Sequence, residues 1–205
     1  ETSAELWVLA QSLTATDNIL TKRTTAAWST ITQNDAIVST STKGHRMDAQ
    51  TIHGKLFLAH DSSIDRLHVY DGTNLRRAGL AEPAAPTVAN TGAGTFSGTR
   101  YYRVRYVVLS GSTVLRRSEP SDSLTFVPSG SGSAARVTMP ASIGESETHW
   151  EVEASLDNGN FYRVVRQVIA TTTYDDSTAY STGYAVSGTL SEPVGDYTVI
   201  PSGKY

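Results

Sequence analysis

Apolar and polar residues alternate most regularly between residues 101 and 108, where aromatic and β-branched side chains occupy every second position. A second alternation follows at residues 150–154, and shorter runs lie at residues 124–126, 136–139 and 161–165. A period of two is typical of strands that bury one face. The pattern therefore predicts a β-sheet core, and we expect its members to include Tyr102, Val104, Tyr106, Trp150, Val152 and Tyr162.

In the first third of the chain, one pattern of apolar and polar residues occurs twice. Residues 6–29 and residues 56–75 each read as two short strands across a polar turn, ending in a bulky apolar residue, and their offset drifts from 50 to 47 residues. Repeats of about 40–50 residues are typical of β-propeller blades. Two blades cannot bury their faces alone, because stacked neighbours supply the core. We therefore expect residues 1–80 to rely on other segments or subunits.

Two prolines within residues 81–86 favour an extended linker. We place the first domain boundary at this linker and predict three parts in all. Residues 1–82 would form propeller-like β repeats, residues 83–190 a β-sandwich, and residues 191–205 a return segment toward a further β element.

Composition supports a fold built from strands. Ser and Thr supply 51 of the 205 residues, and β-branched side chains pack well on a pleated surface. The sequence thus predicts an all-β fold class, with a partial β-propeller-like sheet segment followed by a sandwich. The chain has no cysteine, which excludes a disulfide scaffold, a zinc–thiolate site and a cysteine nucleophile.

Charge limits the classes of partner. A net charge of −3 and a pI near 5.9 do not support nucleic-acid binding by the chain as a whole. No run of eighteen apolar residues and no basic-then-apolar leader is present, so we expect no membrane insertion. Residues 43–117 carry a net charge of +6 and residues 118–205 carry −7. Pairing of strands within one domain is the simpler interpretation, and steering of one subunit onto the next is the alternative.

Two groups of residues are candidates for metal binding. Histidines recur at positions 45, 53, 60 and 68, but no carboxylate or cysteine lies at ligand spacing beside them. The run at residues 157–160 lacks the alternate acids and distal glutamate of a calcium loop, and its Asn158–Gly159 pair predicts a type I′ hairpin turn instead. We expect no metal and no cofactor.

Four glutamates cluster near His149, at positions 145, 147, 151 and 153. Paired carboxylates can act as acid and base in glycoside cleavage. Glu151 and Glu153 fall on the predicted outward face of a strand, however, where charge is expected without any catalytic role. No nucleophile elbow, phosphate loop or zinc-protease motif is present, so we expect no enzyme.

The second half of the chain resembles a fibronectin type III domain whose strand signatures stand in a rotated order. The resemblance covers roughly residues 83–185, and Met139 stands near the place of the tryptophan that is usual in the second strand. The segments that carry it are residues 102–106, 118–121, 150–153, 158–162 and 173–176. It implies that the strands at residues 101–108 and 150–154 are neighbours in one sheet. Together with their matched alternation, this predicts that Arg103 and Arg105 face Glu151 and Glu153, as exposed pairs that contribute about 0.2–1 kcal/mol each.

Residues 53–57 and 65–72, followed by a short proline linker and such a sandwich, are similar to segments of virion proteins of tailed bacteriophages. The resemblance implies a structural tail component in the virion, similar to the nozzle of a short tail. It would assemble with copies of itself into a cyclic oligomer, contact other tail proteins and let DNA pass without sequence recognition. Two alternatives remain open: a glycan-binding adhesin module, or the accessory domain of a secreted hydrolase.

Overall fold

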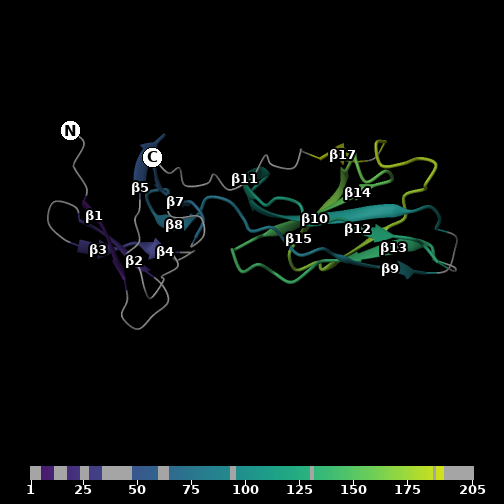
Figure 1. Cartoon of the computed structure of the whole chain (residues 1–205), viewed down its shortest axis with the longest axis horizontal. Helices are drawn as coiled ribbons and strands as arrows, with labels where there is room; N and C mark the ends of the chain where they lie inside the picture. Colours follow the sequence, from purple (N-terminus) through teal and green to yellow (C-terminus); the bar gives the residue numbers. More distant parts are fainter. Residues whose placement is uncertain are drawn as a thin grey trace. The chain divides into compact units, whose positions relative to one another are not determined.

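The structure is a computed structural model of the chain. It describes residues 6–11, 18–23, 28–33, 48–59, 65–92, 96–129, 132–186 and 188–191, and for residues 6–11, 18–23 and 28 it describes the backbone alone. Every regular element in these ranges is a β-strand, so the fold is all-β (Figure 1). The chain divides into two compact units, of which unit 1 reaches Gly79 and unit 2 begins at Leu80. The predicted return segment lies outside the described residues, except for Ser191.

Unit 1 contains two sheets. Strands β1 (Leu6–Gln11), β2 (Asn18–Arg23) and β3 (Trp28–Thr30) form an antiparallel meander. The second sheet has the order β4-β8-β7-β6-β5, in which β4 joins β8 in parallel and the other neighbours are antiparallel. Its strands are β4 (Thr32–Gln33), β5 (Asp48–Ile52), β6 (Lys55–Ala59), β7 (His68–Tyr70) and β8 (Asn74–Arg77). Both stretches of the predicted repeat therefore form antiparallel strands, while their identity as propeller blades stays a prediction.

Short turns join the strands of this second sheet. His53 and Gly54 connect β5 to β6, and their φ angles of 48° and 73° are those of a type I′ turn, whose twist matches the flanking strands. Between β7 and β8, one carboxylate oxygen of Asp71 accepts hydrogen bonds from the backbone N–H groups of Thr73 (3.0 Å) and Asn74 (2.9 Å). The turn signal of Asp71 and Gly72 thus lies where the chain reverses.

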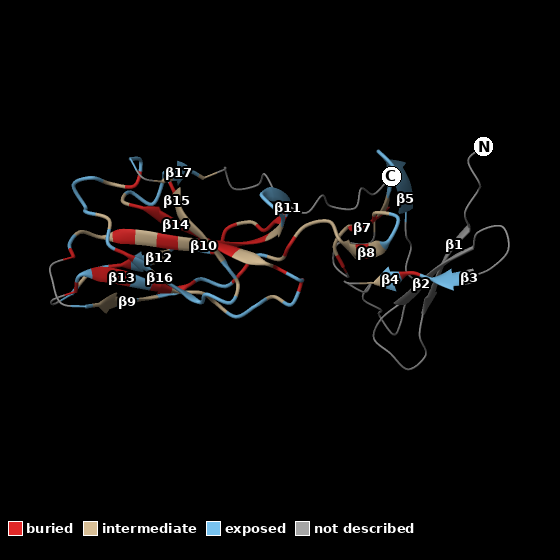
Figure 2. Cartoon of the chain, turned by 180° about the vertical axis from the view of Figure 1, so that it is seen from behind, coloured by how far each residue is buried: buried red, intermediate tan, exposed pale blue. Residues whose placement is uncertain are grey.

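The core of unit 1 is small within the part of the chain that the structure describes. Ile31, Leu58, Tyr70 and Leu75 are buried together, and Leu56 is packed against them half-buried. All five residues of β5 are exposed (Figure 2). The buried cluster therefore ends at β6 and does not extend to the edge of the sheet.

Unit 2 places a three-stranded sheet against a larger one. The smaller sheet has the order β16-β13-β9, with β9 (Thr87–Thr91), β13 (Ala134–Thr138) and β16 (Thr173–Asp176). The larger sheet has the order β11-β10-β14-β15-β17, and β12 also pairs with β10. Its strands are β10 (Arg100–Ser110), β11 (Thr113–Arg117), β12 (Leu124–Phe126), β14 (His149–Ser155), β15 (Tyr162–Val168) and β17 (Thr189–Leu190).

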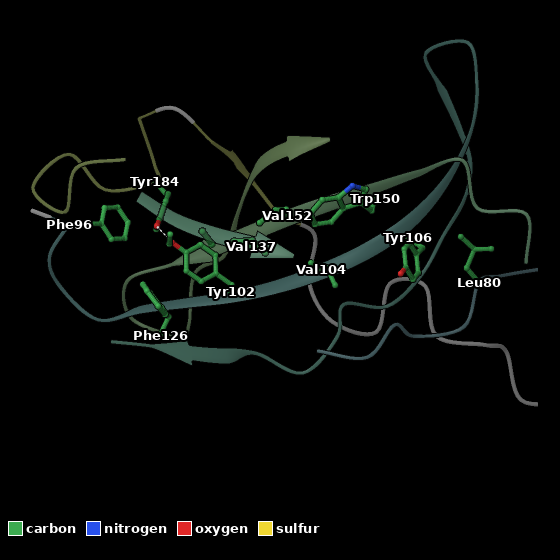
Figure 3. Packing of buried hydrophobic residues seen from close by; sticks show 12 residues of the cluster. Leu80, Phe96, Tyr102, Val104, Tyr106, Phe126, Val137, Trp150, Val152 and Tyr184 are labelled. Atoms are coloured by element: carbon green, nitrogen blue, oxygen red, sulfur yellow. Dashed lines mark hydrogen bonds between the residues drawn. The ribbon is translucent and has the colours of Figure 1, made fainter. Parts of the chain in front are cut away.

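One hydrophobic cluster joins the two sheets of unit 2 (Figure 3). The larger sheet contributes residues of β10 and β14, and the smaller sheet contributes Ala135 and Val137. Of the predicted core, Tyr102, Val104, Tyr106, Trp150 and Val152 are fully buried, and Tyr162 packs against the cluster half-buried. The period of two therefore identified the face on which the core forms.

Two serines extend the hydrogen-bonded ladder of β10 beyond β11. The backbone N–H of Tyr106 donates to Ser118 Oγ (2.9 Å) and that of Val104 donates to Ser121 Oγ (3.0 Å). The N–H groups of the serines donate in return to the carbonyl oxygens of Tyr106 and Val104. Pro120, between them, has no N–H to donate. The serine hydroxyls thus satisfy buried backbone groups that an uninterrupted strand would otherwise pair.

The predicted type I′ turn at Asn158 and Gly159 is wrong. Strands β14 and β15 are joined by a longer loop, and only Asn158 of the pair has a positive φ. A carboxylate oxygen of Asp157 accepts the backbone N–H groups of Gly159 (2.8 Å) and Asn160 (2.9 Å). Side-chain hydrogen bonding from Asp157 therefore sets this loop, in place of the dipeptide preference.

Candidate functional site

The face of the larger sheet that points away from the core carries the densest cluster of charge in the described residues. Register places Arg103 of β10 opposite Glu153 of β14, and Arg105 opposite Glu151, as the matched alternation predicts. Three further arginines contact the same glutamates. We call this cluster the arginine–glutamate face, and its members are Arg103, Arg105, Arg117, Glu151, Glu153, Arg163 and Arg166.

Glu153 lies between the two arginines of β10. Arg103 Nε donates to Glu153 Oε2 at 2.5 Å, and Arg105 Nε donates to Glu153 Oε1 at 2.9 Å. Arg105 also donates to the carbonyl oxygen of Ser118 at 3.0 Å. The guanidinium of Arg103 lies 4.0 Å from the centre of the Phe161 ring, which is cation–π geometry. These contacts fix both arginines flat against the sheet.

Glu151 is bound by three arginines from two strands. Arg117 of β11 donates to Oε2, while Arg163 (3.2 Å) and Arg166 (2.6 Å) of β15 donate to Oε1. Arg105, which stands opposite Glu151 in the register, bonds Glu153 instead. The carboxylate therefore links β11 and β15 across β10 and β14.

A register shift explains why Arg163 and Arg166 reach the same carboxylate. Residues three apart on a regular strand point to opposite faces. Here Glu153 pairs with Arg163 and Glu151 with Arg166, so three residues of β14 lie opposite four of β15, with the shift between Val152 and Glu153. A bulge of this kind re-aims side chains. It brings both arginines to the face of Glu151.

The expectation that Glu151 and Glu153 lie exposed on an outward face is wrong. Both side chains and that of Arg105 are fully buried, whereas Arg103, Arg163 and Arg166 keep 11–28% of their side-chain surface exposed. The long arginine stems lie over the carboxylates and exclude water from them. The stabilisation of about 0.2–1 kcal/mol that was expected for an exposed ion pair therefore does not apply to them. These are buried pairs, for which the loss of one partner is costly.

The hydrogen bonds of Glu151 and Glu153 limit the reactions in which these carboxylates could take part. Each of the four oxygens of Glu151 and Glu153 accepts from a guanidinium. The other two glutamates of the cluster near His149 organise the loop before β14. Glu147 accepts the backbone N–H groups of Ile143 and Glu145, and Glu145 accepts that of Ala81 at 2.9 Å. The arrangement therefore favours a structural role over acid–base catalysis for these four carboxylates.

A second polar cluster lies inside the core, around Asp176. The hydroxyls of Tyr102 (2.7 Å) and Tyr184 (2.5 Å) donate to Asp176 Oδ2, and Arg100 Nη1 donates to the Tyr184 hydroxyl at 2.6 Å. The two tyrosines point their hydroxyls toward each other (Figure 3). Burial, followed by the charge of Asp176, raises the pKa of both phenols well above the usual range. The cluster therefore holds its phenols protonated and ties the chain after β16 to β10.

The described residues contain no group of three or more His, Asp or Glu side chains arranged to hold a metal. His53 lies in the exposed β5–β6 turn. His68 is buried, with Nδ1 2.8 Å from the carbonyl oxygen of Arg66 and Nε2 3.8 Å from Asp65. His45 and His60 lie outside the described residues. In the same part of the chain, no helix long and apolar enough to cross a membrane is found.

Sequence reasoning missed most of the charged contacts. Arg117, Arg163 and Arg166 were not predicted to join Glu151, and Asp176 was not predicted to bind Tyr102 and Tyr184. A signal was present for Arg163 and Arg166, because they lie on the strand that follows β14 in the sequence and supply more positive charge than Arg103 and Arg105 alone. The contact between Asp176 and Tyr102 joins residues 74 positions apart, which no local pattern encodes.

Comparison of the chain with family models, with curated proteins and with solved structures finds no match.

Proposed function

We propose that the chain is a structural component of a bacteriophage tail, which assembles with copies of itself into a ring or tube around the path of the DNA, in the manner of a short-tail nozzle. Catalysis has no part in this function. The proposal comes from the resemblance of residues 53–57 and 65–72 to tail proteins, and the DNA would pass without sequence recognition.

One structural observation carries the self-assembly in this proposal. The described part of unit 1 buries four apolar residues in one cluster, and strand β5 at its edge is exposed at every position. The apolar cluster stops short of β5, so this edge of the five-stranded sheet is left uncovered in the described residues. Contact with further chain would cover it, and obligate contacts of this kind bury more than about 2,000 Å² in total.

The geometry of unit 2 supports a module that acts by shape. The carboxylates of Glu151 and Glu153 are bound to guanidiniums, and that of Glu147 is bound to backbone N–H groups. Eight aromatic residues of unit 2 would be the candidates for a sugar-stacking platform: Phe96, Tyr101, Tyr102, Tyr106, Trp150, Phe161, Tyr162 and Tyr174. None of them is exposed, since five are buried and three are intermediate. Core packing is therefore their role, and the glycan-binding alternative gains no support from them.

The test is the mass and symmetry of the full chain in solution. Light scattering after size exclusion should give a mass of several copies, and class averages of negatively stained particles should show rotational symmetry about an open centre. A monodisperse monomer without cyclic order would overturn the proposal. Binding of that monomer to a glycan array would then favour the adhesin.

A further inference from the structure

We infer that strand β5 pairs edge to edge with β5 of a second copy of this chain, antiparallel and centred on Gln50. This inference goes beyond the proposed function and does not rest on it. A two-fold contact joins two copies through the same surface, whereas a ring closes through head-to-tail contacts between different surfaces.

Strand β5 extends the sheet beyond the core of unit 1. It pairs with β6 on one side, and its other edge meets no strand in the described ranges. Ala49 stands opposite Leu58, which is fully buried, yet Ala49 is exposed. Ile52 keeps 48% of its surface exposed. Both faces and the outer edge of β5 are therefore open to a partner.

The register fixes which backbone groups point outward. Ile52 and Lys55 close a two-residue turn, and such a closing pair exchanges both of its hydrogen bonds. Because antiparallel pairs alternate, Gln50 and Asp48 also bond to β6, while the N–H and C=O groups of Ala49 and Thr51 point away from it. The outer edge thus offers two residues whose N–H and C=O groups pair with no strand of the described ranges. The Thr51 carbonyl oxygen accepts the side-chain amide of Gln50 at 3.2 Å and keeps a second lone pair for a partner strand.

Several strand edges of the described sheets are irregular or very short. Strands β11 and β15 carry register shifts, and β4 and β17 have two residues each. Such irregular or very short strands are the usual protection against edge pairing, together with proline and lysine. Strand β9 is a regular edge strand of five residues like β5, but three of its residues are half-buried, whereas every residue of β5 is exposed. Strand β5 keeps an unbroken register over five pairs and contains neither proline nor lysine. Strand β5 is therefore regular and long enough to pair with a strand of another chain.

The edge is complementary to itself. With Gln50 opposite Gln50 of the second copy, Ala49 stands opposite Thr51 and Thr51 opposite Ala49, so the two outward residues of each strand exchange four hydrogen bonds. Asp48 then stands opposite Ile52 of the second copy, which keeps the two Asp48 carboxylates apart. On the other side of Ile52, Lys55 of β6 is its partner in the register and lies on the same face of the sheet. The Lys55 side chain can therefore reach across Ile52 to Asp48 of the second copy, and the two-fold symmetry provides this contact twice.

The core faces of the two copies would also join. Ala49 and Thr51 share the sheet face of Leu58 and Leu56. In the paired sheet these small side chains connect the leucines of one copy to those of the other across a single surface. Charge, hydrogen bonding and apolar surface thus select a second copy of β5 as the occupant of this edge.

Cysteine cross-linking tests the register directly, because the full chain contains no cysteine. Two Gln50 residues form a non-hydrogen-bonded pair with Cα atoms about 4.5 Å apart, which lies within the range of a disulfide. The Gln50→Cys variant should convert to a covalent dimer under oxidised glutathione. Asp48→Cys is the matched control on the same exposed strand and should stay monomeric on a denaturing gel, because its counterpart is Ile52. Equal cross-linking of both variants, or of neither, would overturn the inference.

Proline substitution tests the hydrogen bonds. Thr51→Pro removes one outward N–H without touching the ladder to β6, and sedimentation velocity should show loss of the two-fold species. Val114→Pro is the control, because Val114 occupies the equivalent place beside a two-residue turn, on the exposed edge strand β11. It should leave the association unchanged, and far-ultraviolet circular dichroism checks that both variants fold. Association of Thr51→Pro equal to that of the unmodified chain would overturn the inference. A cyclic particle whose Gln50→Cys variant does not cross-link would overturn it too, while leaving the proposed function intact.

Discussion

The two units are built from the same kind of element and differ in what covers it. Unit 2 packs two sheets face to face around one cluster of twelve buried residues, whereas the described part of unit 1 gathers four beside a single sheet. Strand propensity is similar in both, since β-branched and aromatic residues occur throughout. The contrast teaches that strands become stable through a second layer that covers their apolar face.

The charged pairs of the two units differ in how far the arginine is buried. In unit 2, Arg105 and Glu153 are bonded while fully buried. In unit 1, Asp65 keeps only 3% of its side chain exposed, but its partner Arg77, at 2.9 Å, keeps 20% exposed. The arginine–glutamate face lies on the side of its sheet that points away from the core, so the arginine side chains, and not a second sheet, cover its carboxylates.

The largest effect should come from truncating the core. Trp150 is fully buried and its indole N–H donates to the carbonyl oxygen of Thr171 at 2.6 Å. We expect Trp150→Ala to lower the free energy of unfolding of unit 2 by about 3–5 kcal/mol. Leu75→Ala, the matched change in unit 1, should cost near the lower end of about 2–5 kcal/mol, because a site beside one sheet relaxes more readily. Denaturant-dependent hydrogen exchange, read on peptides of each unit, measures both. A larger loss for Leu75→Ala would reverse the comparison.

Removal of one buried carboxylate should rank second. Glu151→Gln leaves Arg117, Arg163 and Arg166 without their shared charge partner. We expect a loss of about 3 kcal/mol, at the low end for a broken buried pair because two of these arginines are partly exposed. The same denaturation experiment measures it. Asp175→Asn is the control, because it breaks the exposed Arg136–Asp175 pair of the smaller sheet and should change stability little. Equal effects of the two changes would show that burial does not strengthen the arginine–glutamate face.

Alkaline pH should weaken unit 2 through its tyrosines. Burial raises the pKa of Tyr106 to about 12, and burial with the charge of Asp176 raises that of Tyr174 to about 12. A phenol whose pKa is raised on folding stabilises the fold fully below its unfolded pKa of 10.0, and this contribution is lost as pH rises toward 12. The urea midpoint of unit 2 should therefore fall across this window, and Tyr106→Phe should reduce the fall. A midpoint that stays level while tyrosinate absorbance increases would contradict it.

Local periodicity was enough to predict the strands and the inner face of unit 2. Tyr102, Val104 and Tyr106 alternate along β10, and a period of two assigns such residues to one face without any long-range information. The sequence could not reveal that the opposite face is also buried. That outcome depends on arginines of β11 and β15 lying across β14, and for Arg163 and Arg166 on a bulge that no residue pattern marked.

Contacts between distant residues were equally out of reach. Asp176 binds Tyr102 from a strand of the other sheet, and β4 joins β8 in parallel although β5, β6 and β7 lie between them in the sequence. Neither follows from neighbours in the sequence. At Asn158 and Gly159 a local dipeptide preference gave the wrong turn, because the carboxylate one position earlier hydrogen-bonds the backbone and sets the loop.

The smallest effects should come from two turns that are alike in both units. Asp71 in unit 1 and Asp157 in unit 2 each accept the backbone N–H groups two and three residues later. For Asp71, burial raises the pKa, but the N–H groups of Asn74 and Thr73 and the Arg76 guanidinium outweigh it and lower the pKa. For Asp157, the N–H groups of Gly159 and Asn160 lower the pKa. Each carboxylate therefore stabilises its turn above the unfolded pKa, and this is lost as pH falls.

Alanine at either turn should then have a similar, local consequence. We expect Asp71→Ala to cost about 1 kcal/mol or less, because the hydrogen bonds that are lost lie in a surface turn where water can replace the carboxylate. In each variant the amide protons two and three residues later should exchange faster, as measured by nuclear magnetic resonance, while the amides of β10 and β14 keep their protection. Acidification of the unmodified chain should reproduce the faster exchange in both turns. If Asp157→Ala also exposed the amides of β14, the turn would contribute to the core of unit 2, and the difference between the units would no longer be one of packing alone.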